Sequence, residues 1–290
     1  MDYQDFDGSK TIPEMAYYPT RASLDAAVQA SEQNGVTPRI LLISHPMNPL
    51  GICYPPEVIQ EMVDWCRERE IHLISDEIYS GSVYRKDQAN FVSTMEVASN
   101  ASDSDFLGLG PYVHMVYAFS KDFALSGLRV GALYSENPEI RMPLQKLNDL
   151  CSISSQTQLL VESMLTTASG DPKVSWTRRF LSRNHERLRA RGDAWEQCLD
   201  ELGIPYLKAT AGLFVWMDFS EFLPEDGTAE ERERALYMEL LKEYGLLFTP
   251  GRSMKNERPG FFRCVFTAAS DEGFELGMER LRKYVQAKRT

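Results

Sequence analysis

The fold is decided between residues 40 and 76, where the chain reads ILLISHPMNPLGICYPPEVIQEMVDWCREREIHLISD. The apolar run at 40–44 stops at a turn rich in proline and asparagine, which is typical of a strand buried on both faces. Pro55 and Pro56 then open an amphipathic helix that extends to about Glu70. A second apolar run, 71–75, ends at Asp76. This order predicts a parallel sheet with helices on both faces.

The same alternation continues downstream. Val113 to Phe119 predicts a third strand, which ends at Ser120 and Lys121, and Leu128 to Leu133 predicts a fourth. A helix is also expected upstream, around Ser23 to Gln33. The large domain therefore has the pattern of an α/β protein.

The pattern changes after about Asn137, where long helical stretches at 154–168 and 175–202 replace the alternating units. A smaller α+β unit is expected beyond them. Its strands are predicted at 204–208, 213–219, 246–249 and 261–267, and its helices at 229–244 and 271–286. We place the boundary inside the helix at 175–202, which gives a large domain at 1–185 and a small domain at 186–290.

Composition excludes several classes of function. The formal net charge of -11 argues against a nucleic-acid partner, which would require a clustered basic surface. The chain starts without a basic, apolar leader and has no run of about 20 apolar residues, so we expect a cytoplasmic protein with no membrane partner. Five scattered cysteines without a CxxC pair predict buried thiols, with no disulfide framework and no metal site.

Three polar side chains follow the ends of the predicted strands. Asn48 lies in the turn after the first strand, Asp76 closes the second, and Lys121 comes just after the third. Ligands of open parallel sheets bind outside the carboxyl ends of the strands. Each residue alone is weak evidence, because a carboxylate that closes a strand is more often a cap or a turn former.

Together these side chains suit an aldehyde cofactor built on a pyridine ring. A lysine in a partly desolvated cleft is the expected amine nucleophile, and Lys121 fits this role. Asp76 would keep the ring nitrogen protonated. Asn48 and Tyr79 would donate hydrogen bonds to the phenolic oxygen. Arg129, eight residues after Lys121, would bind the phosphate.

Three segments carry a resemblance to a known family. The signature segments of class I/II aminotransferases resemble three segments of this chain, Asn48–Gly51, Ser75–Tyr79 and Ser120–Gly131. The residues in these segments are most similar to those of the aminocyclopropane-carboxylate synthase branch. Downstream, Ala211–Asp218 and Pro259–Phe266 are similar to segments of that branch's small domain. The similarity extends from about Arg39 to near the C-terminus. In the family an arginine of the last segment grips the substrate α-carboxylate, so the resemblance assigns this role to Arg263.

The resemblance implies a fold and an activity. The fold is the pyridoxal-phosphate transferase fold type I, with an incomplete, mostly parallel large domain and a small C-terminal α+β domain. The activity is that of an aminotransferase or a synthase-like lyase on an α-amino acid, with pyridoxal 5'-phosphate as cofactor and a Schiff base on Lys121. Transamination, γ-elimination and β-elimination all begin with removal of the Cα proton by the lysine. A homodimer is implied if the full-length form exists.

The sequence departs from the family at its beginning. Family members start with an N-terminal arm, a glycine-rich loop and an aromatic residue that stacks on the ring, so we expect this chain to be N-terminally truncated. Ala118 also replaces a serine that many members carry three residues before the lysine. Losing two or three hydrogen bonds to the phosphate, at roughly 1.5 to 3 kcal/mol each, would weaken cofactor binding roughly a hundred-fold to a million-fold.

Alternatives stay open at this point. The chain could be a catalytically impaired remnant or a pseudoenzyme that pairs with an intact relative through an exposed sheet edge. A nicotinamide enzyme is disfavoured because no G-x-G-x-x-G follows a predicted strand. Among single residues, Arg263 could form a surface ion pair, Tyr79 could be core packing, and Asn48 could be a turn former. We interpret four isolated histidines as structural: His45, His72, His114 and His185.

Overall fold

The computed structural model describes residues 12–99, 108–167 and 175–290. These residues form two compact units. The larger unit comprises residues 17–47 and 53–185, and the smaller comprises 12–16, 48–52 and 186–290. The segment at 48–52, which contains Asn48, thus packs with the C-terminal part of the chain although it lies between the first two strands of the larger unit.

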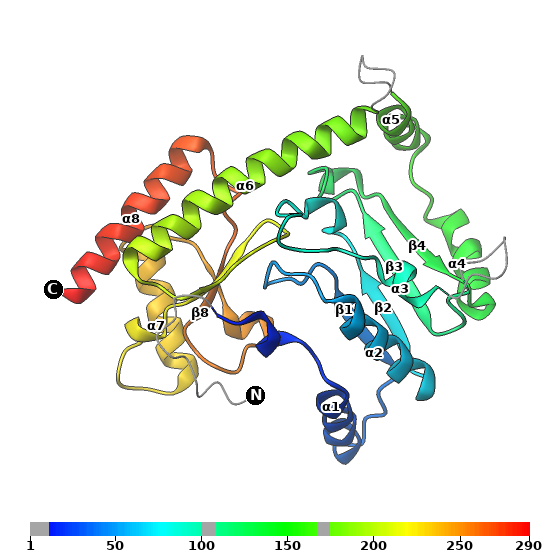
Figure 1. The fold of residues 1–290 in the computed structure, drawn as a ribbon, viewed down its shortest axis with the longest axis horizontal. Coiled ribbons are helices and arrows are strands. Elements are labelled where there is room, and N and C mark those ends of the chain that lie inside the picture. The colour runs from blue at the N-terminus through cyan, green and yellow to red at the C-terminus, as the bar shows by residue number, and fades with distance from the viewer. Residues whose placement is uncertain (1–11, 100–107, 168–174) are drawn as a thin grey trace. The chain divides into compact units, whose positions relative to one another are not determined.

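A four-stranded sheet is the centre of the larger unit (Figure 1). Its strands, in spatial order, are β1 (Ile40–Ser44), β2 (His72–Asp76), β3 (Val113–Ala118) and β4 (Gly131–Ser135). The first three run parallel, as the sequence predicts, but β4 is antiparallel to β3. The connection at 119–130 holds only a short 3-10 helix, Ser126–Leu128, and has no crossover helix to return the chain in the parallel direction. The sheet is therefore mostly parallel, as expected, with β4 as its one antiparallel strand among the described residues.

Helices cover one face of this sheet. α2 (Pro56–Glu68) starts with proline at its first turn and buries one side that includes Ile59, Val63 and Cys66. α3 (Thr94–Ala98) is capped by the Ser93 side chain. The hydroxyls of Thr94 and Ser75 lie 2.9 Å apart, which places α3 on the face that also carries Ile43, Leu73 and Val113.

The opposite face of β1 is open to solvent. Ile40 and Leu42 are 57% and 66% exposed, whereas Ile43, on the covered face, is 5% exposed. Leu133 on β4, which points to the same side as Leu42 by strand register, is 47% exposed. The expectation that the first strand is buried on both faces was therefore wrong.

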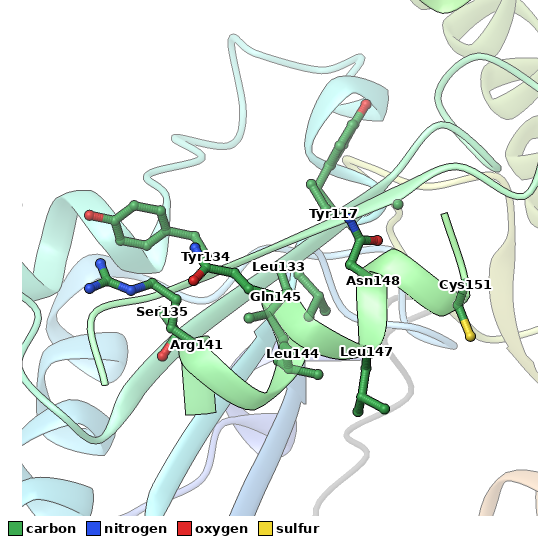
Figure 2. A pocket seen from close by; sticks show the side chains of 13 residues that line it. Tyr117, Leu133, Tyr134, Ser135, Arg141, Leu144, Gln145, Leu147, Asn148 and Cys151 are labelled. Atoms are coloured by element: carbon green, nitrogen blue, oxygen red, sulfur yellow. The ribbon is translucent and has the colours of Figure 1, made fainter. Parts of the chain in front are cut away.

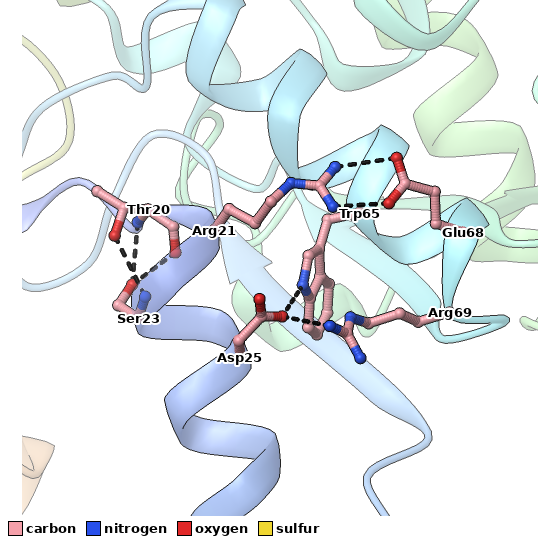
Figure 3. A network of polar contacts seen from close by, with 7 residues as sticks. All are labelled: Thr20, Arg21, Ser23, Asp25, Trp65, Glu68 and Arg69. Carbon is pink, nitrogen blue, oxygen red and sulfur yellow. Dashed lines mark hydrogen bonds and ion pairs between the residues drawn. The ribbon is translucent and has the colours of Figure 1, made fainter.

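Polar contacts fix α1 (Arg21–Gln33) against α2 (Figure 3). A capping box formed by Thr20 and Ser23 starts the helix. Arg21 forms two hydrogen bonds with the carboxylate of Glu68, at 2.6 and 2.9 Å. One oxygen of Asp25 accepts from both the indole of Trp65 and the guanidinium of Arg69.

Two further helices follow β4. α4 (Pro138–Leu150) was missed in the sequence, although Asn137 caps it and Pro138 occupies its first turn. α5 (Ser155–Thr166) follows it, and α6 (Trp176–Leu202) leads from the larger unit into the smaller one. Within 12–99, 108–167 and 175–290, no helix has the length and apolar character needed to cross a membrane.

The smaller unit is an α+β structure. Its antiparallel sheet contains, in spatial order, β5 (Tyr206–Leu207), β6 (Val215–Asp218), β8 (Phe261–Cys264) and β7 (Thr249–Pro250). α7 (Ala229–Lys242), α8 (Asp271–Arg289) and the second half of α6 accompany this sheet. Aromatic side chains fill the core, which includes Trp195, Phe219, Phe248, Phe262 and Tyr284. The helices and three of the strands lie where the sequence predicts them, with shorter strands, whereas β7 shares only Thr249 with the strand predicted at 246–249.

Candidate active site

Asp76 and Lys121 lie at the same edge of the larger sheet. β2 and β3 are parallel neighbours, and Asp76 is the last residue of β2, level with Val116 of β3. β3 ends at Ala118, and Lys121 follows it with an exposed side chain. The two residues that the sequence predicts as anion and amine are thus brought to one end of adjacent strands.

Asp76 has a carboxylate with spare hydrogen-bonding capacity. It is half-buried, and the backbone amide of Ile78 donates to its Oδ1 at 3.2 Å. Burial raises the pKa of Asp76 above its usual value, and the Ile78 amide offsets part of this effect. A cationic donor beside the carboxylate would therefore be strongly favoured.

Tyr79 lies in the turn that follows β2. Its side chain is 5% exposed, and it directly precedes the 3-10 helix Ser80–Ser82. The connection at 119–130 carries Lys121 and is called the Lys121 loop below. Arg129 is exposed near the end of this loop, where its Nη1 donates to the carbonyl of Ser126 at 3.0 Å. The four predicted residues of the larger unit therefore lie at the end of β2, as Asp76 does, or in the segments that follow β2 and β3.

The Lys121 loop contains two backbone conformations that are unusual for residues other than glycine. Ala124 and Arg129 have φ angles of 54° and 55°, in the left-handed region. Each costs roughly 1 to 2 kcal/mol relative to ordinary backbone. Such strain persists where the surroundings determine the conformation, and it is concentrated at binding and catalytic sites.

A buried carboxylate next to Lys121 was not assigned a role from the sequence. Asp122 is 1% exposed and accepts three hydrogen bonds. Its donors are the Gly81 amide at 2.7 Å, the Ser82 hydroxyl at 2.6 Å and the Tyr117 hydroxyl at 3.0 Å. Desolvation raises the pKa of Asp122 to about 6, although all three donors oppose this shift. The only signal in the sequence was a charged residue directly after the lysine.

Arg263 and Asn48 meet in the smaller unit. Arg263, on β8, donates from Nη1 to the amide oxygen of Asn48 at 2.7 Å and from Nη2 to the Thr249 hydroxyl at 3.3 Å. Its guanidinium lies 5.4 Å from the ring centre of Phe214, while its buried Nε has no hydrogen-bond partner among the described residues. The guanidinium is thus oriented by neutral oxygens.

Gly51 holds the Asn48 segment in place. Its carbonyl accepts from the amides of Thr210 and Ala211 at 2.8 and 2.9 Å. Its φ is +74°, and a Cβ there would lie 2.9 Å from the Cβ of Ala209. Only glycine fits this conformation and this close approach without strain.

None of the six predicted site residues lines a pocket of about 940 Å³ in the larger unit (Figure 2). It is formed between β4 and α4, and Leu133, Leu144 and Leu147 give it an apolar wall. Leu133, Leu144 and Leu147 are more than 40% exposed. We interpret this hollow as part of the uncovered surface of the larger unit rather than as a catalytic cleft.

The histidines make structural contacts. His45 is fully buried and stacks on Phe91, and burial lowers its pKa to about 4. His72 and His114 hydrogen-bond to each other at 2.9 Å. His185 contacts the carbonyl of Gly81 at 2.7 Å. Among the residues at 12–99, 108–167 and 175–290, no group of three or more His, Cys, Asp or Glu side chains could hold a metal ion.

The chain resembles known sequences over most of its length. The family model for aminotransferase class I and II matches residues 12–281. 1-Aminocyclopropane-1-carboxylate synthase 1 of Oryza sativa subsp. indica is 36% identical over 268 residues, which cover 92% of this chain and 53% of the relative. 1-Aminocyclopropane-1-carboxylate synthase 7 of Arabidopsis thaliana is 35% identical over 270 residues, which cover 93% of this chain and 58% of the relative. The chain therefore spans a little over half the length of these relatives.

Solved structures show the same fold. An aspartate aminotransferase double mutant of Thermus thermophilus has a TM-score of 0.74 at 24% identity, over 94% of this chain and 62% of its own. An aromatic aminotransferase from Pyrococcus horikoshii OT3 has a TM-score of 0.74 at 21% identity, over 96% of this chain and 66% of its own. The α/β architecture with its mostly parallel sheet is therefore that of fold type I. From the family match and the shared fold, we conclude that the chain belongs to the class I and II aminotransferases.

Proposed function

We propose that this chain carries the cofactor-binding centre of a pyridoxal-phosphate-dependent enzyme that acts on an α-amino acid, as an aminotransferase or as a lyase similar to the aminocyclopropane-carboxylate synthases. One observation carries the proposal. Asp76 and Lys121 follow adjacent parallel strands at one edge of the sheet, in segments that resemble the family's signatures. This edge is where open α/β sheets bind ligands.

The side chains at this edge suit the cofactor chemically. Asp76 is a half-buried carboxylate with a raised pKa and lone pairs free of described donors, so it favours a protonated ring nitrogen. The exposed amine of Lys121 is available to the aldehyde, and the exposed guanidinium of Arg129 offers a planar fork for the phosphate. When bound, pyridoxal phosphate supplies an electron sink for charge that develops at the substrate Cα.

Each residue then has a definite task. Lys121 would hold the cofactor through its amine and would serve as the base for the proton on the substrate Cα. Tyr79 and Asn48 donate hydrogen bonds to the phenolic oxygen. Arg263 binds the substrate α-carboxylate, a role that suits a guanidinium already oriented by Asn48 and Thr249.

The setting of this activity is also part of the proposal. We place the enzyme in the cytoplasm, acting on a small-molecule amino acid, with no nucleic-acid or membrane partner. A homodimer is proposed for a form as long as the relatives. Because transamination, γ-elimination and β-elimination share the first proton transfer, product analysis after incubation with single amino acids would identify the reaction: a keto acid, a cyclopropane amino acid or an eliminated thiol.

A second candidate is a catalytically impaired protein that pairs with an intact relative. The uncovered apolar side chains of Ile40, Leu42 and Leu133 on one sheet face favour it, because such surfaces mark protein contacts. This candidate requires no covalent cofactor, so cofactor binding separates the two.

The discriminating experiment is a titration of the purified chain with pyridoxal phosphate, followed by visible absorbance. The first candidate predicts a new visible band that is absent from Lys121→Ala and retained in Lys208→Ala, which removes another exposed lysine. A wild-type chain without the band, or a band that survives Lys121→Ala, would overturn the first candidate and leave the pairing protein.

A further inference from the structure

The turns that carry Tyr79 and Lys121 are joined by one buried side chain. Asp122 directly follows Lys121, and both of its carboxylate oxygens are used. Oδ2 accepts from the Gly81 amide at 2.7 Å and from the Tyr117 hydroxyl at 3.0 Å, and Oδ1 accepts from the Ser82 hydroxyl at 2.6 Å. Two of these donors belong to the turn after β2, and the third belongs to β3 itself.

The Gly81 peptide group is held from both sides. While its amide donates to Asp122, its carbonyl accepts from Nε2 of His185, on α6, at 2.7 Å. Because a carbonyl oxygen can only accept, Nε2 of His185 carries the proton in this contact. Burial lowers the pKa of His185, and the contact with the Gly81 carbonyl opposes this shift. A Cβ at residue 81 would lie 2.6 Å from Oδ2 of Asp122, so only glycine permits this contact.

From this geometry we propose that Asp122 is a positioning residue, which fixes the Lys121 loop to the Tyr79 turn and so sets the direction from which the Lys121 amine meets the cofactor. The inference rests on the proposed function. It goes beyond it because Asp122, which is buried and bonded only to protein donors among the described residues, would act through the two turns and not by touching the cofactor or the substrate.

The charged form of Asp122 is the one that performs this task. A carboxylate can accept from all three donors. In an amide or a protonated carboxyl group, one of the two acceptor oxygens is replaced by an N–H or O–H group, which cannot accept from the donor that faces it. The variant Asp122→Asn keeps the size and burial of the side chain and removes only this acceptor. It is therefore a direct probe of the connection between the two turns.

The chain offers a matched control in Glu77. This carboxylate is 4% exposed and accepts from the Ser93 hydroxyl at 2.8 Å and from the Thr94 amide at 2.8 Å. The Ser75 hydroxyl, on β2, also donates to it at 3.3 Å, so its partners belong to β2, to α3 and to the residue that caps α3, and none of them belongs to the Lys121 loop. Glu77→Gln thus neutralises a similarly buried carboxylate at the end of the neighbouring strand β2 without loosening that loop.

The first arm of the test uses the chain without cofactor. Amide hydrogen exchange at Gly81 and the rate at which an acylating reagent modifies Lys121 are measured by mass spectrometry for the wild type and both variants. Asp122→Asn should speed exchange at Gly81 about tenfold to a hundredfold, the effect of losing one hydrogen bond to a charged group, and should change Lys121 labelling. Glu77→Gln should leave both within about twofold of the wild type. Equal behaviour of the two variants would overturn the inference.

The second arm adds pyridoxal phosphate and follows the visible band. Asp122→Asn should raise the half-saturating concentration about tenfold to a hundredfold, and Glu77→Gln should not. If the wild type shows no band that depends on Lys121 while the first arm behaves as expected, the proposed function fails and the structural connection stands. If the band is normal in Asp122→Asn, the inference fails and the proposed function stands.

Discussion

Neutralising Asp122 should change how the stability of the chain depends on pH. The carboxyl group is 1% exposed, and its pKa is raised from 3.8 to about 6, mainly by desolvation. Ionising it is therefore harder in the folded chain than in the unfolded chain. The stability that the protonated form contributes is fully present below pH 3.8 and is lost as the pH rises through about 6.

The size of the effect follows from the shift. A shift from 3.8 to about 6, at 1.36 kcal/mol per pKa unit, corresponds to about 3 kcal/mol. Asn at this position does not titrate. The free energy of unfolding of Asp122→Asn should therefore rise by about 2 to 3 kcal/mol relative to that of the wild type between pH 4 and pH 7.

Urea denaturation at pH 4, 5, 6 and 7 measures this difference. Asp76 and Glu77 also have raised pKa values, but neither shares a hydrogen bond with Asp122, so their titration is common to both proteins and cancels when one curve is subtracted from the other. A difference that stays constant from pH 4 to pH 7, or one that favours the wild type more as the pH rises, would refute the reasoning.

Three further substitutions test the packing by urea denaturation. Phe262→Ala, at a fully buried position beside Phe219, should lower the free energy of unfolding by about 3 to 5 kcal/mol; a loss below 1 kcal/mol would contradict the proposed core. Gly51→Ala should lower it by about 2 to 4 kcal/mol, because φ is +74° and the new Cβ meets Ala209; an unchanged midpoint would refute this. Arg21→Ala should change it by less than about 1 kcal/mol, since the ion pair with Glu68 is exposed, and a larger loss would show that the pair is worth more than its exposure implies.

The pattern of apolar residues along the chain predicted those helices and strands whose formation depends on nearby residues in the sequence. The runs at 40–44 and 71–75 became β1 and β2 because an unbroken apolar run between a turn and a helix start fits few other structures. α4 was missed because its start, Asn137 and Pro138, was not used as a cap signal. The direction of β4 depends on how the 119–130 connection folds back, which no periodicity encodes.

The candidate site was predicted residue by residue but not as a set of contacts. The positions of Asp76 and Lys121 follow from one rule about parallel strands. The bond between Asn48 and Arg263 joins residues 215 apart in the chain, and nothing near either one predicts it. Asp122 was overlooked for a similar reason, because two of its three donors lie 40 and 41 residues away, in another turn.

The central claim is that Lys121 is the amine that holds pyridoxal phosphate. Reduction of the protein–cofactor mixture with borohydride makes the bond permanent, and peptide mapping by mass spectrometry then identifies the modified lysine. The account predicts one dominant modification, on Lys121. Labelling spread evenly over the exposed lysines, such as Lys208, or concentrated on a different lysine, would contradict it.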